Sequence, residues 1–227
     1  TTGVRNVARQ LMKASERMTT YKVLESRVGT LGKPSKMPGY SYGLPAKECN
    51  VGARLVKIAG STCNGCYALK GNYQFRDVQR AQYRRLASIV RDDWTDSMVE
   101  LITKRNNRGD FFRWHDSGDI QDLDHLTKIV EVCRRTPHVK HWLPTREYRV
   151  VGIWQRLHGE FPENLVVRLS AHMVDSPPPT TDLPTSTVHN AVEPIGQLCP
   201  APTQDNNCGD CRACWTPNVV NVSYHKH

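Results

Sequence analysis

The sequence predicts an α/β fold with a parallel sheet that is either open or closed into a partial βα barrel. Two observations support this fold class. From about residue 72 onward, strand patterns alternate with helix patterns, and the helices are long enough to cross back over a sheet, as in parallel βα units. The chain also has 227 residues, which is enough to bury a core without disulfides.

The helices are predicted by apolar side chains that recur at spacings of three and four residues. The first is expected over 73–91. The second is expected to begin at Asp92 or Asp93, either of which could cap it, and to end at Gly109. Two more are expected over 122–135 and 150–159. The side chains expected on the buried faces of the first three helices are Phe75, Val78, Gln82, Leu86 and Ile89, then Trp94, Met98, Leu101 and Ile102, then Leu123, Leu126, Val130 and Cys133.

Strands are expected where short apolar runs lie between these helices, over 110–115, 138–145, 164–170 and, as the last strand, 185–192. Residues 28–47 are rich in Gly, Pro and Ser and are expected to wrap irregularly onto the domain. Residues 175–185 form a proline-rich connection that cannot be helical. The expected organisation is an irregular or helical segment at 1–48, a partial βα barrel at 49–192 and a cysteine-rich, metal-binding extension at 193–227.

The composition favours a soluble cytoplasmic protein with an anionic partner. No run approaches the roughly 18 apolar residues of a membrane span, and residues 1–17 lack the apolar block of a signal peptide, so no membrane association is expected. The formal net charge is +9, which favours nucleic acid or an anionic small molecule as the partner. In a reducing cytoplasm, cysteines serve as metal ligands more often than as cross-links.

The eight cysteines fall into three groups. Cys133 lies on the apolar face of its helix and is expected to be a small buried hydrophobe. The C-terminal group has the spacing C-x8-C-x2-C-x2-C, which lets three thiolates converge from one tight loop; its members are Cys199, Cys208, Cys211 and Cys214. Zinc normally takes two separated C-x2-C pairs, whereas consecutive C-x2-C steps are typical of cubane clusters. We therefore expect a [4Fe-4S] cluster, with zinc as the alternative metal.

The N-terminal group is formed by Cys49, Cys63 and Cys66, with the spacing C-x13-C-x2-C. A closed site needs four ligands, so three thiolates on a cubane leave one iron with an open position, which a reactive cluster requires. Alternatively, Cys63 and Cys66 pair with two C-terminal cysteines around a single metal. The sequence thus predicts one cluster or two.

Polar side chains follow three successive predicted strands. Asp116 and Asp119 follow the strand at 110–115, and Arg146 and His172 follow the next two. Because the carboxyl ends of parallel strands line the functional face of a βα fold, these four are expected to form a ligand pocket and to serve as its catalytic residues. Alternatively, the two aspartates cap the next helix.

A stripe of arginines predicts a second kind of partner. Arg76, Arg80 and Arg84 recur every fourth residue opposite the apolar face of the first helix, so they could lie along the phosphates of a nucleic acid. Tyr73 and Tyr83 are close enough in sequence to stack on a base. The alternative is a solvated basic face with no partner.

Four segments, "YSYGLPA", "CYALKGNY", "FRWHDSGDIQD" and "HVKHWLPTREY", followed by Cys-Pro and the close-set cysteines, resemble the bacteriophage family of mycobacteriophage gene product 88. That family is in turn similar to a shortened relative of radical S-adenosylmethionine (SAM) enzymes. The resemblance covers roughly residues 40–215. It implies a phage origin, hence the cytoplasm of the host cell, and a cluster-bearing partial βα barrel.

The resemblance to radical-SAM enzymes also implies roles for individual residues. Cys49, Cys63 and Cys66 match the loop in which such enzymes hold their cluster. Gly118 and Asp119 match a glycine-and-acid motif that contacts the amino group of SAM.

The sequence differs from the usual C-x3-C-x2-C pattern by a long insertion between the first two cysteines. It also has Gly65 where an aromatic residue is typical, with Tyr67 displaced to follow the last cysteine.

Two functions follow from these observations. The first is a radical-SAM-like iron–sulfur enzyme, with SAM as a further cofactor and a nucleic-acid or nucleotide-like substrate. The second is a non-catalytic iron–sulfur or zinc protein with a fully cysteine-ligated centre that binds nucleic acid. A cluster with an open iron should respond to SAM, whereas a fully ligated one should not.

Overall fold

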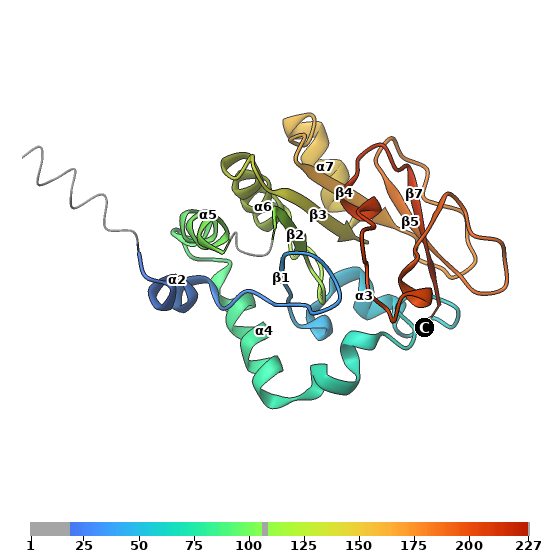
Figure 1. Cartoon of the computed structure of the whole chain (residues 1–227), viewed down its shortest axis with the longest axis horizontal. Coiled ribbons are helices and arrows are strands. Elements are labelled where there is room, and N and C mark those ends of the chain that lie inside the picture. The colour runs from blue at the N-terminus through green and yellow to red at the C-terminus, as the bar shows by residue number, and fades with distance from the viewer. Residues whose placement is uncertain (1–18, 106–108, 227) are drawn as a thin grey trace, which may run out of the picture.

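The computed structural model describes residues 19–105 and 109–226, and it contains one sheet of seven parallel strands in the order β1-β2-β3-β4-β5-β7-β6 (Figure 1). Each neighbouring pair runs parallel. The strands are β1 (Tyr40–Tyr42), β2 (Phe111–Trp114), β3 (Lys140–Thr145), β4 (Leu165–Ser170), β5 (Thr185–His189), β6 (Gln197–Leu198) and β7 (Asn221–His225). The predicted α/β class is therefore confirmed at the level of a parallel sheet with helices.

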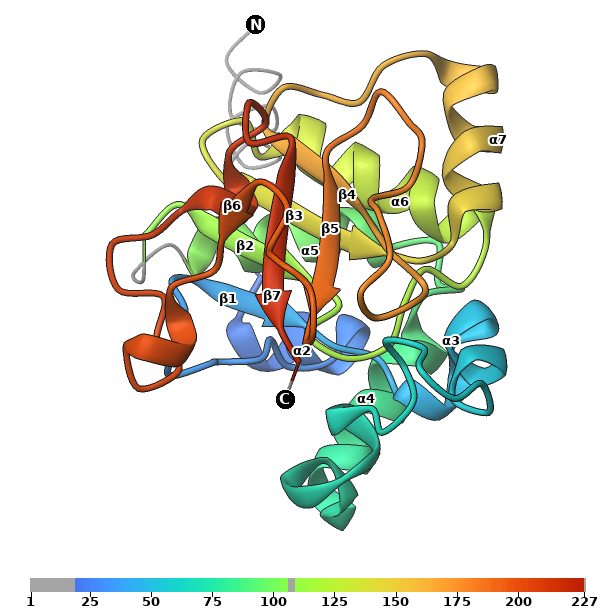
Figure 2. The same ribbon diagram turned by 90° about the vertical axis from the view of Figure 1, so that its right-hand side faces the viewer.

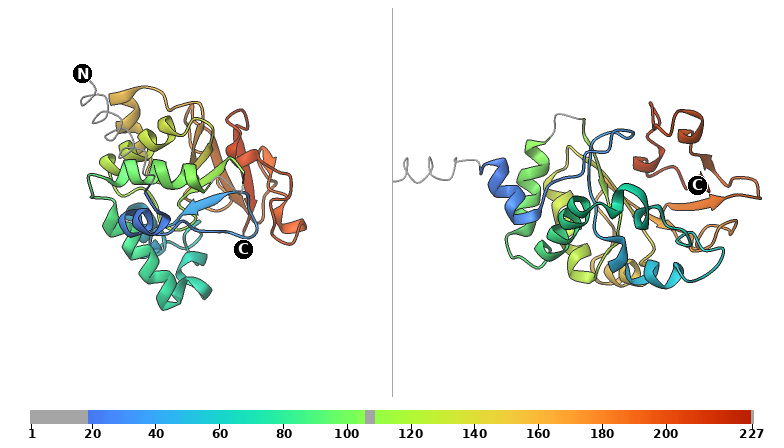
Figure 3. Two further views of the ribbon diagram at one scale, coloured as in Figure 1. Left: turned by 60° about the vertical axis from the view of Figure 1, so that its left-hand side comes forward. Right: turned by 90° about the horizontal axis from the view of Figure 1, so that it is seen from below.

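Most of the longer helices cover one face of this sheet, and the C-terminal segment lies on the other side of the strands (Figures 1 and 3). The helices are α2 (Tyr21–Val28), α3 (Asn50–Leu55), α4 (Arg76–Ser88), α5 (Trp94–Lys104), α6 (Leu123–Arg135) and α7 (Tyr148–His158). Helices α6 and α7 form the crossovers β2–α6–β3 and β3–α7–β4, whereas coil joins β4 to β5. The proline-rich stretch 175–185 lies in that coil and is not helical, as predicted.

All four predicted strands and all four predicted helices are present, with shifted ends. The last strand ends at His189 rather than at residue 192. One predicted core position is wrong: Phe75 is 61% exposed, because the helix begins only at Arg76 and Phe75 precedes its first turn. Asp93 stands at the start of α5, but its side chain makes no capping bond and instead pairs with Arg91.

Five α-helices and strands of the described residues were not predicted from sequence patterns, among them α3, which lies between Cys49 and Cys63. Helix α2 and strand β1 fall in the N-terminal part of the chain, and β1 corrects the expectation that 28–47 is wholly irregular. Strands β6 and β7 fall in the cysteine-rich part and pair with each other, while β7 also pairs with β5. The C-terminal segment is thus hydrogen-bonded into the sheet that carries the rest of the fold.

The core lies between the sheet and the helices. On β2, Phe112 and Trp114 point into it, whereas Phe111 and Arg113 point to the opposite face. This alternation is the ordinary period of a strand, and it gives the two faces different chemistry. Cys133 is fully buried in the core, as predicted.

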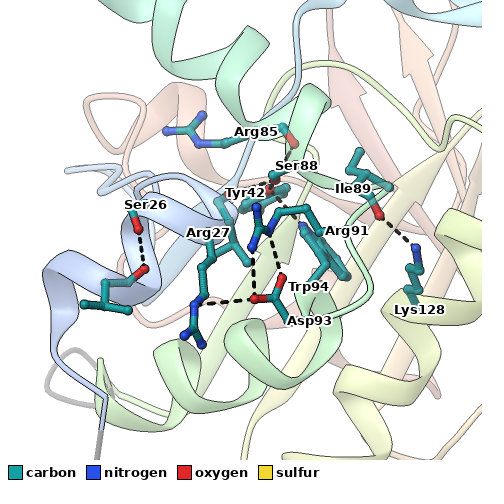
Figure 4. A network of polar contacts seen from close by, with 12 residues as sticks. Ser26, Arg27, Tyr42, Arg85, Ser88, Ile89, Arg91, Asp93, Trp94 and Lys128 are labelled. Atoms are coloured by element: carbon teal, nitrogen blue, oxygen red, sulfur yellow. Dashed lines mark hydrogen bonds and ion pairs between the residues drawn. The ribbon is translucent and has the colours of Figure 1, made fainter.

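A buried hydroxyl group fastens β1 to the helices (Figure 4). The Tyr42 hydroxyl donates to the Val28 carbonyl (2.6 Å) and accepts from the indole N–H of Trp94 (3.3 Å). Burial raises the pKa of Tyr42 to about 12, so it stays a neutral donor. Nearby, Arg91 and Arg27 both pair with Asp93. These hydrogen bonds hold the end of β1 against the helices, and the segment that leads to Cys49 begins there.

Within residues 19–105 and 109–226, no helix is both long and apolar enough to cross a bilayer.

Candidate functional site

The N-terminal cysteines lie in the connection that follows β1. Cys49 directly precedes α3, and Cys63 and Cys66 lie in the turns after it. Folding brings Cys49 and Cys63 to the same helix residue: a Cβ added at Gly52 would lie 2.9 Å from the Cys49 Cβ, 3.5 Å from the Cys49 Sγ and 3.8 Å from the Cys63 Sγ. The lack of a side chain at Gly52 therefore lets both cysteines approach α3 closely.

The three thiols influence one another electrostatically. The pKa of Cys49 is raised, first by burial and then by the negative charges of Asp119, Cys63 and Cys66. Burial also raises the pKa of Cys63, against the opposing effect of Arg146. Uncharged thiols are thus favoured while no cation is bound. A positive metal centre would reverse that preference, because thiolates are the metal-binding form.

Backbone and side-chain hydrogen bonds hold this cysteine loop on the ends of three strands. After β2, the Gln121 carbonyl accepts from Asn50 (2.9 Å). After β3, Glu147 Oε1 accepts from the Val51 N–H (2.8 Å). After β4, the His172 carbonyl accepts from the N–H of Thr62 (2.8 Å). The thiols consequently lie at the carboxyl ends of the strands.

Asp119 is the buried acid of this region and is 5% exposed. Its Oδ1 accepts from the Ile120 N–H (2.8 Å) and from the Thr145 hydroxyl (2.6 Å), and its Oδ2 accepts from the Arg146 N–H (2.9 Å). Burial raises its pKa, while these three donors oppose the shift. Asp119 therefore ties the end of β2 to the end of β3.

Neither predicted site aspartate caps the following helix. Asp122 takes that role, accepting from the His125 N–H (2.8 Å). The alternative that Asp116 or Asp119 caps the next helix is thus wrong, because α6 begins only at Leu123.

Arg146 and His172 lie beside the same loop. Arg146 Nε donates to the Thr62 hydroxyl (3.0 Å), one residue before Cys63. The His172 ring stacks on Tyr148 with 4.4 Å between centroids, and its Nε2 lies 3.3 Å from the Arg146 carbonyl oxygen. The structure thus brings the guanidinium of Arg146 to the cysteine loop and places the imidazole of His172 beside Arg146.

Asp116 lies on a different side of this region. Its carbonyl accepts from the Tyr67 hydroxyl (2.5 Å), and its carboxylate interacts electrostatically with Tyr73, Arg85 and Arg113. The Oδ1 atom of Asp116 is buried and has no hydrogen-bond partner. Two of the four predicted catalytic side chains, Asp119 and Arg146, therefore act on the thiols. His172 lies beside Arg146, and Asp116 faces an adjoining cluster of tyrosines and arginines.

The C-terminal cysteines form a second group. Cys199 follows β6, and the other three lie in short turns before β7, where the Cys211 N–H donates to the Cys208 carbonyl (3.0 Å). Burial raises the pKa of Cys199, Cys208 and Cys214, the last to about 11. Electrostatic interactions link Cys199 with Cys211, Cys208 with both of these, and Cys214 with Cys199.

The two groups lie apart, on different sides of the strands (Figure 2). The charges that act on Cys49 and Cys63 come from their own group, Asp119 and Arg146, and those on the C-terminal thiols come from their own group and from arginines. In the part of the chain that the structure describes, no three His, Cys, Asp or Glu side chains are placed to hold a single metal ion.

The predicted arginine stripe is exposed on a projecting element. Helix α4 extends away from the sheet (Figure 2), and Arg76, Arg80 and Arg84 are all exposed on it. Arg80 lies 3.5 Å from Asp77. The Tyr83 hydroxyl donates to Glu48, so only its ring is free to stack on a partner.

Sequence reasoning missed two arginines inside the sheet, Arg113 on β2 and Arg168 on β4. Both could have been noticed as single charges within the apolar runs "FFRW" and "LVVRLS". It also missed Thr62, whose hydroxyl connects Arg146 to the segment after β4. A threonine in a loop has no pattern that would indicate this.

Comparison with known families gave one match, in which the family model described as "Gene product 88" covers residues 9–217. Comparisons with curated proteins and with solved structures gave no match.

Proposed function

The chain belongs to the gene product 88 family of phage proteins, and we propose that it is an iron–sulfur protein whose cluster at Cys49, Cys63 and Cys66 keeps one iron open to a ligand. The observation that carries this proposal is the gathering of three thiols, rather than four, at the carboxyl ends of β2, β3 and β4. Parallel α/β proteins bind their ligands at this edge.

The spacing of the cysteines in the sequence supports a cluster. Zinc normally takes two separated C-x2-C pairs, whereas the N-terminal group offers three thiols and the C-terminal group has consecutive C-x2-C steps, which are typical of cubane clusters.

The order of elements supports a radical-SAM-like arrangement. The cysteine loop follows the first strand, and a glycine-and-acid pair, Gly118 and Asp119, follows the second. Bound at the thiols, such a cluster would supply an electron to a sulfonium ligand at its open iron. The long insertion before Cys63 is accommodated by α3, which packs its N-terminal end against Glu147.

The chain's own residues would orient that ligand. Asp119 Oδ2 accepts one bond, from the Arg146 N–H, and a carboxylate oxygen has a second lone pair for an amino group. The Arg146 guanidinium offers donors to a carboxylate beyond the one bonded to Thr62. His172, held by Tyr148, and Asp116 are the remaining candidates for substrate contacts.

The substrate class proposed is a nucleic acid or a nucleotide-like molecule. The net charge of +9 and the exposed arginines of α4 support it, because α4 follows the cysteine loop directly. The same arginines support the second candidate function, a non-catalytic nucleic-acid-binding protein with fully ligated metal centres. In that case the four C-terminal cysteines form the closed centre, and the N-terminal thiols bind no cluster with an open iron.

The two candidates differ in their response to SAM. Protein purified anaerobically should contain iron and sulfide, and adding SAM to the reduced protein should change its electron paramagnetic resonance spectrum. A Cys49→Ser/Cys63→Ser/Cys66→Ser variant should lose that response while it keeps the C-terminal metal. A spectrum unchanged by SAM would reject the open-iron proposal and favour the binding protein.

A further inference from the structure

Two arginines on the inner strands point toward the C-terminal cysteines. Arg168 interacts electrostatically with Cys214 and Tyr224, and Arg113 interacts with Cys208, Cys214 and Tyr224. The Cys214 Sγ in turn lies 3.1 Å from the Tyr224 hydroxyl. Arginine side chains from two strands of the sheet thus face one group of thiols.

Arg168 is fully buried, with no exposed surface. Its Nη1 donates to the Thr185 and Val219 carbonyls (2.7 and 3.0 Å), and its Nη2 donates to the Ala213 carbonyl (3.2 Å). Its Nε has no hydrogen-bond partner. Carbonyl oxygens solvate the guanidinium, but they do not neutralise its charge.

Arg113 is only partly compensated, because the carboxylate of Asp116 acts on it but forms no ion pair with it. Its Nη1 has only the sulfur of Met37 (3.9 Å), its Nε is buried without a partner, and its guanidinium lies over the Trp142 ring at 4.6 Å. Among the described residues, no Asp or Glu lies within ion-pair distance of Arg113 or Arg168.

Buried cations without counter-ions are strongly unfavourable, and proteins normally pair them. The C-terminal cysteines are the acidic side chains next to Arg168, because its Nη2 donates to the carbonyl of Ala213, the residue before Cys214. A group that converts these thiols to thiolates would supply the negative charge that Arg168 lacks. Metal binding does so, with release of the thiol protons to solvent as metal–sulfur bonds form.

We propose that Arg113 and Arg168 are the internal counter-ions of an anionic metal–thiolate centre formed by Cys199, Cys208, Cys211 and Cys214. This rests on the C-terminal centre of the proposed function and is independent of the open iron at the other cysteines. Four thiolates around one divalent core, whether zinc or an oxidised cubane, leave about two negative charges. The buried guanidinium of Arg168 offsets one of these charges, and that of Arg113, which Asp116 also attracts, offsets part of the other. Both arginines act through the thiolates and are positioning residues.

The test uses Arg168→Met, which removes the charge and keeps an unbranched apolar side chain, and Arg168→Lys, which keeps the charge. Arg85→Met is the matched control, because Arg85 is also buried and bonded to backbone carbonyls, of Thr30 and Gly43, but does not face the C-terminal cysteines. All variants are made in the Cys49→Ser/Cys63→Ser/Cys66→Ser background, so that bound metal reports the C-terminal centre alone. Metal content, the rate of metal loss to a chelator and the melting temperatures of loaded and stripped protein are measured.

We expect Arg168→Met to speed metal loss about tenfold or more and to lower the melting temperature of the loaded protein more than that of the stripped protein. Arg168→Lys should stay near the parent protein, and Arg85→Met should lower both melting temperatures equally. The proposal would be overturned if Arg168→Met lowered the melting temperatures of loaded and stripped protein equally, or if it left the rate of metal loss unchanged. The absence of metal in the parent background would also overturn it.

Arg113→Met provides a second variant if Arg168→Met does not fold, because Arg113 makes no hydrogen bond to the backbone of the C-terminal segment. It should show the same faster metal loss. If the arginine variants lose metal faster as expected but the protein does not respond to SAM, only the proposed open iron is rejected.

Discussion

The two cysteine groups offer the same donor atom on different supports. The N-terminal thiols lie on a loop that Asn50, Val51 and Thr62 fasten to the ends of three strands by hydrogen bonds from one part of the protein to another. The C-terminal thiols lie in short turns whose hydrogen bonds are mostly local, such as that from Cys211 to Cys208. Their longer-range attachments include the bond from Cys208 to the Lys36 carbonyl.

The charges around the groups differ as well. Asp119 and Arg146, one acid and one base, act on the N-terminal thiols, and both lie where a ligand would meet the strand ends. Arginines and a tyrosine, but no carboxylate, act on the C-terminal thiols. Under the proposed function, this difference predicts that the fold preforms the N-terminal site and that metal binding at the C-terminal site contributes to folding.

The largest expected effect is on stability. Cys211→Ser should lower the melting temperature of metal-loaded protein far more than Cys63→Ser does, because metal binding at a structural thiolate site is folding free energy. A loss of about 4 kcal/mol would lower it by roughly 10 °C in a chain of this size. Cys63→Ser should change it by less than about 4 °C, since the loop keeps its hydrogen bonds to the strand ends. Thermal unfolding under anaerobic conditions measures both.

Metal-stripped protein is the control for this prediction. The two serine variants should then melt at similar temperatures, because the difference between them comes from the metal. If Cys63→Ser is the more destabilising variant in loaded protein, the assignment of structural and functional centres is reversed.

Features of the two cysteine groups that depend on local sequence patterns could be predicted from the sequence, whereas features that depend on contacts between distant residues could not. The cysteine spacings and the polar residues at strand ends are local patterns, so they could be recognised before the structure. The burial of Phe75 was mispredicted because helical spacing alone does not determine where a helix begins. Strand β1 has three residues and is formed by pairing with β2, which lies about seventy residues later in the chain.

The partners of buried charges were the least predictable feature. Arg168 is surrounded by carbonyls from 185 and from 213–219, segments that approach it only after the sheet has formed. From the sequence alone, Asp119 could equally be a helix cap, and only its hydrogen bond from Thr145 at the end of β3 distinguishes the two roles. Both assignments need tertiary contacts that no sequence spacing encodes.

A smaller effect is expected on nucleic-acid binding beside the N-terminal group. Replacing Arg76, Arg80 and Arg84 together by Gln should weaken binding and flatten its salt dependence, by up to about 2.7 in the slope of log K against log salt if each arginine contacts one phosphate. Filter binding or fluorescence anisotropy from low to moderate salt measures the slope. The triple variant Arg134→Gln/Arg149→Gln/Arg156→Gln, on α6 and α7, removes the same charge from other exposed positions and is the control. Equal slopes for the two variants, or no binding at low salt, would reject a specific role for α4.

The smallest expected effect is on the contact between Asp119 and SAM. Asp119→Ala removes the acceptor proposed for the ligand's amino group and should weaken the SAM-induced spectral change about tenfold in apparent affinity, or ~1.4 kcal/mol. It also leaves the Thr145 hydroxyl and the Arg146 N–H without their partner, so melting temperature must be followed in parallel. Asp122→Ala is the matched control, because it removes a carboxylate from the same loop at the cost of a helix cap but not of a site contact. In the same spectra the C-terminal centre serves as an internal reference, since a fully ligated cluster has no position for SAM. A SAM titration unchanged by Asp119→Ala would show that Asp119 only joins β2 to β3, and a response of the C-terminal signal to SAM would end the distinction between the two cysteine groups.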